Sequence, residues 1–107
     1  MSLAEKEDIR EFADKVRNAL GDRIQEILLF GSYARDEHVP GSDVDVAIIV
    51  TEKKDGDEDK IWEIAGDYLM RDEIHFMPKI IEKDHFENKV KDGFRFYKNV
   101  REEGVTI

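Results

Sequence analysis

Two aspartates, Asp43 and Asp45, stand one residue apart at the start of an apolar segment. Side chains alternate between the two faces of a strand, so both carboxylates project from the same face. Carboxylates this close repel each other, and a cation relieves the repulsion. Mg²⁺, or Mn²⁺ in its place, takes oxygen ligands and bridges carboxylates to substrate phosphates. The pair therefore predicts a metal site with Asp43 and Asp45 as ligands and as catalytic residues.

Gly31 and Ser32 directly follow the apolar residues 27–30. A glycine after a buried strand lets the backbone turn sharply and approach a ligand closely. If Ser32 begins a short helix, the free amide groups there face phosphate oxygens, and the Ser32 hydroxyl adds a donor. Arg35, about one turn later, either contacts a phosphate or pairs with a nearby carboxylate. These three residues are the predicted phosphate-binding residues.

Each motif has a common structural explanation when it is taken alone. A Gly-Ser pair is an ordinary junction between strand and turn, and two alternating aspartates often mark a solvated strand end. Their combination beside two apolar strands favours function. The histidine in the intervening loop, His38, is expected to be exposed and without a role. Trp62 is expected at the edge of the core or in an interface.

Strands and turns must position these motifs. Residues 27–30 predict a strand covered on both faces, and residues 43–50 alternate as a second strand. Residues 36–42 have the composition of a turn. Residues 74–81 predict a third strand, and Pro78 within it indicates an edge strand or a bend.

The remaining segments read as helices. Apolar residues at helical spacing predict helices at about 4–20 and from about 58 to 69, the latter with Asp55 or Asp57 as N-cap. Asp84 and Glu87 resemble a capping box that opens a last helical region, with a break near Gly93. A short strand at 105–107 follows. This order predicts one α/β (α+β) domain, residues 1–107, with a short mixed sheet and helices mainly on one face.

Composition limits the possible functions. The chain has 107 residues, 40% of them charged, and a formal net charge of −9. Such an acidic chain disfavours binding to long nucleic acids, although a triphosphate held through metal ions remains possible. Cysteine is absent, which excludes disulfides and thiolate metal sites. No apolar stretch is long enough for a membrane span, and a cytoplasmic protein is expected.

The spacing of the motifs resembles the nucleotidyltransferase superfamily related to DNA polymerase beta, in its minimal form. The family signature is Gly-Ser, ten intervening residues and Asp-x-Asp, and here residues 33–42 separate Ser32 from Asp43. Arg35 matches the arginine of the family's Gly-Ser-x-Ala-Arg. The resemblance covers nearly the whole chain and implies the polymerase beta-like palm fold. It also implies that Gly31 and Ser32 contact the triphosphate and that the aspartates hold the metals.

One position departs from the family. A third carboxylate, which serves as metal ligand or base, usually lies on the following strand. If Ile74 and Phe76 face the core, Glu73 and His75 point to the other side, so either could fill this catalytic position. The sequence leaves that choice open.

The resemblance implies a metal-dependent nucleotidyltransferase. It would move a nucleoside monophosphate from a nucleoside triphosphate, expected to be ATP, to an acceptor hydroxyl and release pyrophosphate. The alternative is a nucleotide-binding antitoxin or regulatory subunit, paired with a small all-helical protein of the HEPN type. A structural interaction domain without activity is a third reading. Because so short a chain encloses little of a ligand, a partner or a homo-oligomer is expected. Base preference and acceptor remain open.

Overall fold

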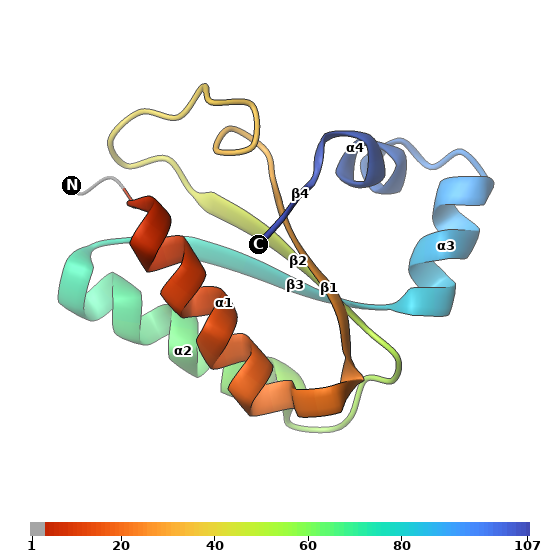
Figure 1. The fold of residues 1–107 in the computed structure, drawn as a ribbon, viewed down its shortest axis with the longest axis horizontal. Coiled ribbons are helices and arrows are strands. Elements are labelled where there is room, and N and C mark those ends of the chain that lie inside the picture. The colour runs from red at the N-terminus through yellow and green to blue at the C-terminus, as the bar shows by residue number, and fades with distance from the viewer. Residues whose placement is uncertain (1–3) are drawn as a thin grey trace.

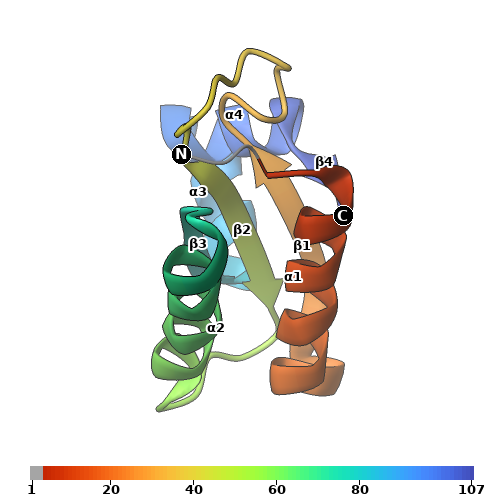
Figure 2. The same cartoon turned by 90° about the vertical axis from the view of Figure 1, so that its left-hand side faces the viewer.

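The computed structural model describes residues 4–107, which form a mixed sheet between two pairs of helices (Figures 1 and 2). The first three residues of the predicted domain lie outside the described part. In chain order the elements are α1 (Lys6–Leu20), the 3₁₀ turn η1 (Gly21–Arg23), β1 (Ile24–Phe30), β2 (Val44–Val50), α2 (Asp57–Asp72), β3 (Phe76–Glu82), α3 (Lys83–Lys91), α4 (Arg95–Glu103) and β4 (Val105–Thr106).

The sheet has the order β3-β2-β1-β4. β1 is antiparallel to β2 and to the short β4, whereas β3 runs parallel to β2. β3 is therefore an edge strand, as Pro78 indicates, because proline cannot donate a hydrogen bond to a further strand. The central strand β2 is almost completely buried, since sheet partners flank it and helices cover both of its faces.

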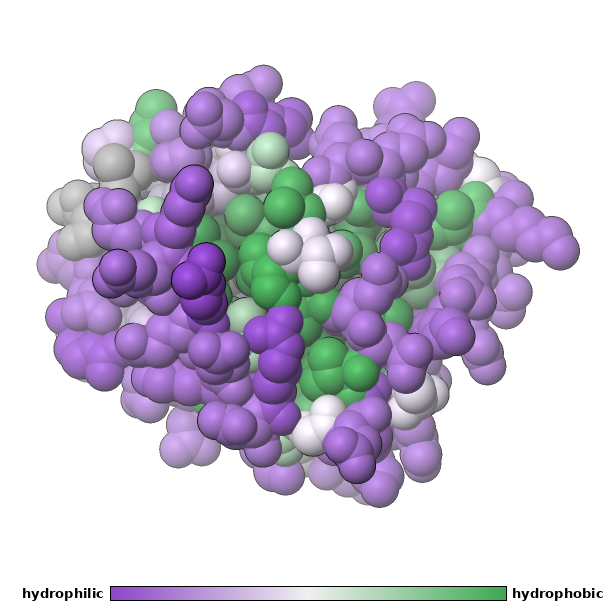
Figure 3. All heavy atoms as spheres, in the orientation of Figure 1, coloured by the Kyte–Doolittle hydropathy of each residue, from purple (hydrophilic) through white to green (hydrophobic). Residues whose placement is uncertain are grey.

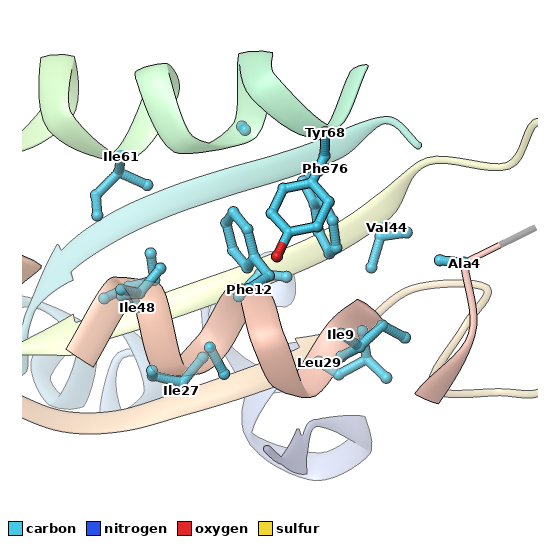
Figure 4. Packing of buried hydrophobic residues seen from close by; sticks show 14 of the residues in the cluster. Ala4, Ile9, Phe12, Ile27, Leu29, Val44, Ile48, Ile61, Tyr68 and Phe76 are labelled. Carbon is cyan, nitrogen blue, oxygen red and sulfur yellow. The ribbon is translucent and has the colours of Figure 1, made fainter. Parts of the chain in front are cut away.

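The two long helices, α1 and α2, cover one face of the sheet, where the larger core lies (Figure 4). The Phe12 ring of α1 stacks on Phe76 of β3 with centroids 4.1 Å apart, and Tyr68 of α2 meets both rings edge-on. The even-numbered β2 residues point into this core: Val44, Val46, Ile48 and Val50. The odd-numbered residues of β2 therefore face the other side of the sheet.

The short helices α3 and α4 pack on that second face through a smaller cluster. Its buried members are Leu28, Ala47, Ile49, Ile81, Phe86 and Val100. The cluster covers the part of this face around Ala47 and Ile49, and it does not include Asp45 near the start of β2. The predicted α+β class with a short mixed sheet is confirmed, with the two longer helices on one face and two shorter helices on the other.

Several local predictions are wrong. Ser32 begins no helix, because residues 31–36 form hydrogen-bonded turns that Asp36 ends with a φ of 57°. β1 starts three residues earlier than the apolar run and includes polar Gln25 and Glu26. α3 begins at Lys83 after Glu82, and Glu82 makes no side-chain capping bond, so the predicted Asp84–Glu87 capping box does not open this helix.

The start of α2 also differs from the prediction. Its N-cap is Gly56, with a φ of 88°, and neither Asp55 nor Asp57 caps it. Asp57 is instead the first helical residue and is 1% exposed. Its carboxylate accepts two hydrogen bonds from Arg23, at 2.6 and 2.9 Å, and one from the Lys54 amide at 2.7 Å. This ion pair ties η1 to the start of α2.

Among the helices of residues 4–107, none is both long and apolar enough to cross a membrane.

Candidate active site

The predicted phosphate-binding turn (the phosphate turn), residues 31–36, begins where β1 ends. Gly31 has a φ of 75°, a conformation that side-chain-bearing residues rarely adopt. The Arg35 amide donates to the Gly31 carbonyl at 3.1 Å, and the Glu37 amide donates to the Ser32 carbonyl at 2.9 Å. These bonds hold one tight loop at the end of the sheet, with Gly31 and Ser32 partly exposed.

The turn packs directly on the second aspartate. Phe30 pairs with Asp45 across β1 and β2, so Gly31 follows immediately beside that carboxylate. A Cβ added at Gly31 would overlap Asp45 Oδ2 and lie 3.3 Å from its Cγ. The absence of a side chain at residue 31 therefore lets the backbone and the carboxylate lie in contact.

Asp43 and Asp45 lie at the same end of β2. Asp43 is about half exposed, whereas Asp45 is partly buried. Burial raises the pKa of the Asp45 carboxyl, the negative charge of Asp43 raises it further, and Arg35 opposes both. Ionising both carboxylates is therefore unfavourable without added positive charge, which fits a divalent cation between them.

The two carboxylates make only part of a coordination shell. Among residues 4–107, no three acidic or histidine side chains are grouped closely enough to hold a metal ion. Mg²⁺ is commonly bound through one or two carboxylates together with substrate phosphates and water. The donor set here matches that mode, in which the substrate completes the site.

Arg35 adopts the ion-pair arrangement. Its guanidinium donates to Glu37 at 3.2 Å and to Glu103 of α4 at 3.4 Å, and the side chain is 44% exposed. The neighbouring carboxylates, Glu37 first, raise the pKa of Arg35, so it remains cationic beside Asp45. A contact between Arg35 and a phosphate stays a prediction.

His75 meets the first aspartate. Its Nδ1 lies 2.9 Å from Asp43 Oδ1, and its carbonyl accepts a hydrogen bond from the Val44 amide at 2.9 Å. Glu73 stands differently, because it is the C-cap of α2 with a left-handed φ of 57°. The predicted strand from residue 74 is therefore two residues too long at its start, and strand alternation does not extend to Glu73. Both residues nevertheless line one hollow of about 270 Å³.

Sequence reasoning missed the immediate neighbours of Asp45. The parallel register pairs Asp45 with Met77 of β3, and the antiparallel register pairs it with Phe30. Alternation puts Met77 on the same face as His75, but only the register between β2 and β3 shows which residue lies beside Asp45. An uncharged thioether and an aromatic ring thus flank the partly buried carboxylate.

His38 also differs from its expected exposed position. Its ring stacks on Tyr33 with centroids 4.0 Å apart and planes 6° from parallel. Its Nδ1 is buried and has no hydrogen-bond partner among the described residues. The Tyr33 hydroxyl accepts a hydrogen bond from the Ala4 amide at 3.0 Å. These contacts brace the loop between the two motifs against the start of α1.

The model of the nucleotidyltransferase domain family matches residues 9–101. Two proteins of Methanocaldococcus jannaschii, each named "Putative protein adenylyltransferase", are similar to this chain. One, MJ0604, is 33% identical over 105 residues, which are 98% of this chain and 99% of that relative. The other, MJ0141, is 38% identical over 78 residues, which are 72% of this chain and 79% of that relative.

Two solved structures share the fold. A toxin-antitoxin with AMP-PNP has a TM-score of 0.58 at 18% identity, and the match covers 90% of this chain and 69% of that one. A mutant of the toxin-antitoxin MntA-HpeT has a TM-score of 0.59 at 17% identity, with the same coverage. The family match, the relatives and the site geometry agree on nucleotidyl transfer as the reaction class. The chain belongs to the nucleotidyltransferase domain family, in its minimal, polymerase beta-like form.

Proposed function

We propose that this protein transfers a nucleoside monophosphate from a nucleoside triphosphate, with ATP as the expected donor, to an acceptor hydroxyl and releases pyrophosphate. The observation that carries the proposal is the contact between Gly31 and Asp45 at one end of the sheet. A phosphate-binding turn that contacts a carboxylate pair can bind one triphosphate in two ways. The turn holds phosphate oxygens directly, and the carboxylates hold them through a metal ion. The cytoplasm, which supplies nucleoside triphosphates, is the expected location.

Asp43 and Asp45 would hold Mg²⁺ or Mn²⁺. When bound, such an ion supplies positive charge that polarises the phosphate oxygens and offsets the charge on the departing pyrophosphate. The amide groups of Gly31 and Ser32, with the Ser32 hydroxyl, would hold the outer phosphates. Arg35 would add positive charge if its guanidinium released a glutamate partner and donated to a phosphate oxygen instead. Catalysis then depends mainly on positioning and charge neutralisation.

In the reaction, the acceptor oxygen forms a bond to the α-phosphorus as the bond to the bridging oxygen of pyrophosphate breaks. The hydroxyl proton must pass to a base. His75 is the better supported base, because Nδ1 can donate to Asp43 Oδ1 and leave Nε2 unprotonated. Glu73 remains the second candidate, since it lines the same hollow as His75.

The acceptor we favour is a hydroxyl on a protein side chain. The support is the name shared by the two relatives, which describes protein adenylyl transfer. A protein acceptor also fits the shallow, open surroundings of Asp43 and His75, both of which are about half exposed. A site of this kind does not have to enclose its acceptor, because the acceptor protein supplies the missing walls.

Calorimetric titration with ATP tests the metal and phosphate grip. We expect clear binding with Mg²⁺ and little binding in a chelator, since Asp43 and Asp45 then face the phosphates as negative charge. Asp43→Asn with Asp45→Asn should remove the metal-dependent binding and leave the fold intact. Equal affinity with and without metal would contradict the proposal. Transfer of label from α-labelled ATP to copurifying protein tests the reaction itself.

The second candidate function is that of an antitoxin or regulatory subunit with a small helical partner. The two solved structures compared with this fold are toxin-antitoxin proteins. An apolar groove of about 380 Å³ also opens between α1 and the C-terminal strand, where Figure 3 shows hydrophobic surface. Its apolar lining consists of Ile9, Leu29, Val105 and Ile107. An open apolar groove of this kind suits a partner side chain.

Copurification from the native source, with light scattering of the pure protein, tests the need for a partner or oligomer. A monomer that transfers nucleotide efficiently to a free small molecule would contradict both the partner and the protein acceptor. A stable complex that binds ATP but transfers no label would favour the regulatory function over the enzyme.

A further inference from the structure

Three neighbouring side chains form a row across the sheet at the carboxylate end. Register places Phe30 of β1 and Met77 of β3 on either side of Asp45, and all three share one face. Lys79 lies two residues beyond Met77 on the same face, opposite Ala47. A lysine therefore lies on the neighbouring strand, diagonally across from the partly buried Asp45.

An aromatic ring from α4 borders this row. Phe96 meets Phe30 edge-on, with centroids 5.6 Å apart and planes at 84°. The residue is 37% exposed, although its ring also contacts Tyr97 edge-on. Because Phe30 directly precedes Gly31, the Phe96 ring contacts the residue just before the phosphate turn.

Lys79 rests on that ring. Its Nζ lies 4.7 Å from the Phe96 centroid, and within the described part of the chain no carboxylate is in ion-pair contact with it. This is notable in a chain of net charge −9, where acidic residues outnumber basic ones. The cation is thus held by the ring and not by an ion pair, and its residue lies two positions beyond Met77 on the same face of β3.

We propose that Lys79 and Phe96 form a nucleotide subsite, in which the Lys79 ammonium pairs with a phosphate oxygen and the Phe96 ring stacks on the nucleobase. The inference rests on the proposed function, because it requires a triphosphate at Gly31 and Asp45. Cation–π contacts at exposed sites are weak, whereas an ammonium–phosphate hydrogen bond is charge-assisted. Binding would draw the ammonium from the ring to a phosphate and free the ring face for the base.

The same chain contains a matched pair away from the site. Lys89 Nζ lies 4.1 Å from the Phe94 centroid, and Phe94 is 50% exposed. Phe94 precedes α4, and no ring contact joins it to the sheet among the described residues. Changes at Lys89 and Phe94 therefore remove one lysine charge and one exposed phenylalanine ring, as the changes at Lys79 and Phe96 do. They leave the proposed subsite intact.

The test compares two probes with Mg²⁺ by calorimetry: ATP, and inorganic tripolyphosphate, which has no base. Phe96→Leu should weaken ATP binding by about 5- to 100-fold, the range for loss of one base stack, and leave tripolyphosphate unchanged. Lys79→Met should weaken both probes by about tenfold or more, because a charged hydrogen bond is lost. Phe94→Leu and Lys89→Met should bind both probes like the native protein.

Failure of this subsite is distinguishable from failure of the proposed function. If the native protein binds neither probe with Mg²⁺, the proposed function fails and the subsite fails with it. If it binds both while Phe96→Leu and Lys79→Met match their controls, only the subsite is overturned. Should Phe96→Leu not fold, Phe96→Trp in a Trp62→Phe background gives a second test. Either probe should draw Lys79 from the ring, but only ATP places a base on it, so the fluorescence should respond differently to ATP and to tripolyphosphate. Equal responses to the two probes, or none, overturn the inference.

Discussion

Gly31 and Asp45 are packed so closely that residue 31 has no room for a Cβ, since that atom would overlap Asp45 Oδ2. The contact links the phosphate turn to the carboxylate pair, and it depends on a single residue type. Substitutions at residue 31 can therefore distinguish two requirements for glycine, namely the positive φ and the close approach of the Asp45 carboxylate.

Gly31→Ala should abolish metal-dependent ATP binding, because the new methyl group displaces the Asp45 carboxylate. Gly56→Ala is the matched control, since Gly56 has a φ of 88° and an added Cβ there meets nothing within 4 Å. Both changes should lower the free energy of unfolding by about 1–2 kcal/mol through left-handed strain. Calorimetry and urea unfolding measure the two effects. Normal ATP binding by Gly31→Ala would show that the phosphates lie elsewhere.

Arg35→Gln should lower the unfolding free energy by less than about 1 kcal/mol, because the pairs of Arg35 with Glu37 and Glu103 are half exposed. If Arg35 also serves a phosphate, the same variant should weaken ATP binding, and the loss should shrink as salt is added. Glu103→Gln, which removes one of the competing carboxylates, should not weaken ATP binding. If Arg35→Gln and the native protein bind ATP with equal affinity, Arg35 has a structural role only.

Asp57 should contribute to stability in a pH-dependent way. Arg23 lowers the pKa of the buried Asp57 carboxyl from 3.8 to about 2. Because the folded pKa lies below the unfolded one, this contribution is complete above about pH 4 and is lost as pH falls toward 2. A depression of this size corresponds to about 2 kcal/mol.

Urea unfolding at several pH values tests that contribution. Asp57→Asn should be less stable than the native protein at pH 7, and the difference should shrink between pH 4 and pH 2. Glu26→Gln, which breaks the more exposed pair with Arg101, should cost less than about 1 kcal/mol. A pH-independent difference for Asp57→Asn would refute the assignment to ionisation.

His38→Phe should stabilise the protein by about 1 kcal/mol. The substitution keeps a ring stacked on Tyr33 and removes the buried Nδ1 that has no partner among the described residues. His38→Ala should do the opposite, because the stack is lost. Thermal unfolding measures both, and a His38→Phe protein that melts below the native one would contradict this account.

The sequence alone determined the motif and most of the elements around it. Gly31, Asp43 and Asp45 could be identified because phosphate turns and carboxylate pairs depend on spacing within one short segment. α1 could be predicted because its apolar residues repeat every three or four positions and its buried face is continuous. Pro78 limited β3 to an edge strand or a strand with a bend, since proline lacks the amide hydrogen that a further strand would need.

The tertiary structure decided which residues distant in sequence become neighbours. Asp57 was expected as a possible helix cap. It is instead buried and paired with Arg23, 34 residues away in the sequence. The register between parallel β2 and β3 put Met77 beside Asp45, and a single helix, α4, brought Phe96 to the row. Local periodicity specifies which way a side chain points along its own strand, whereas its neighbour on the next strand follows from register. That register is set by the packing of the whole core and cannot be read from either strand alone.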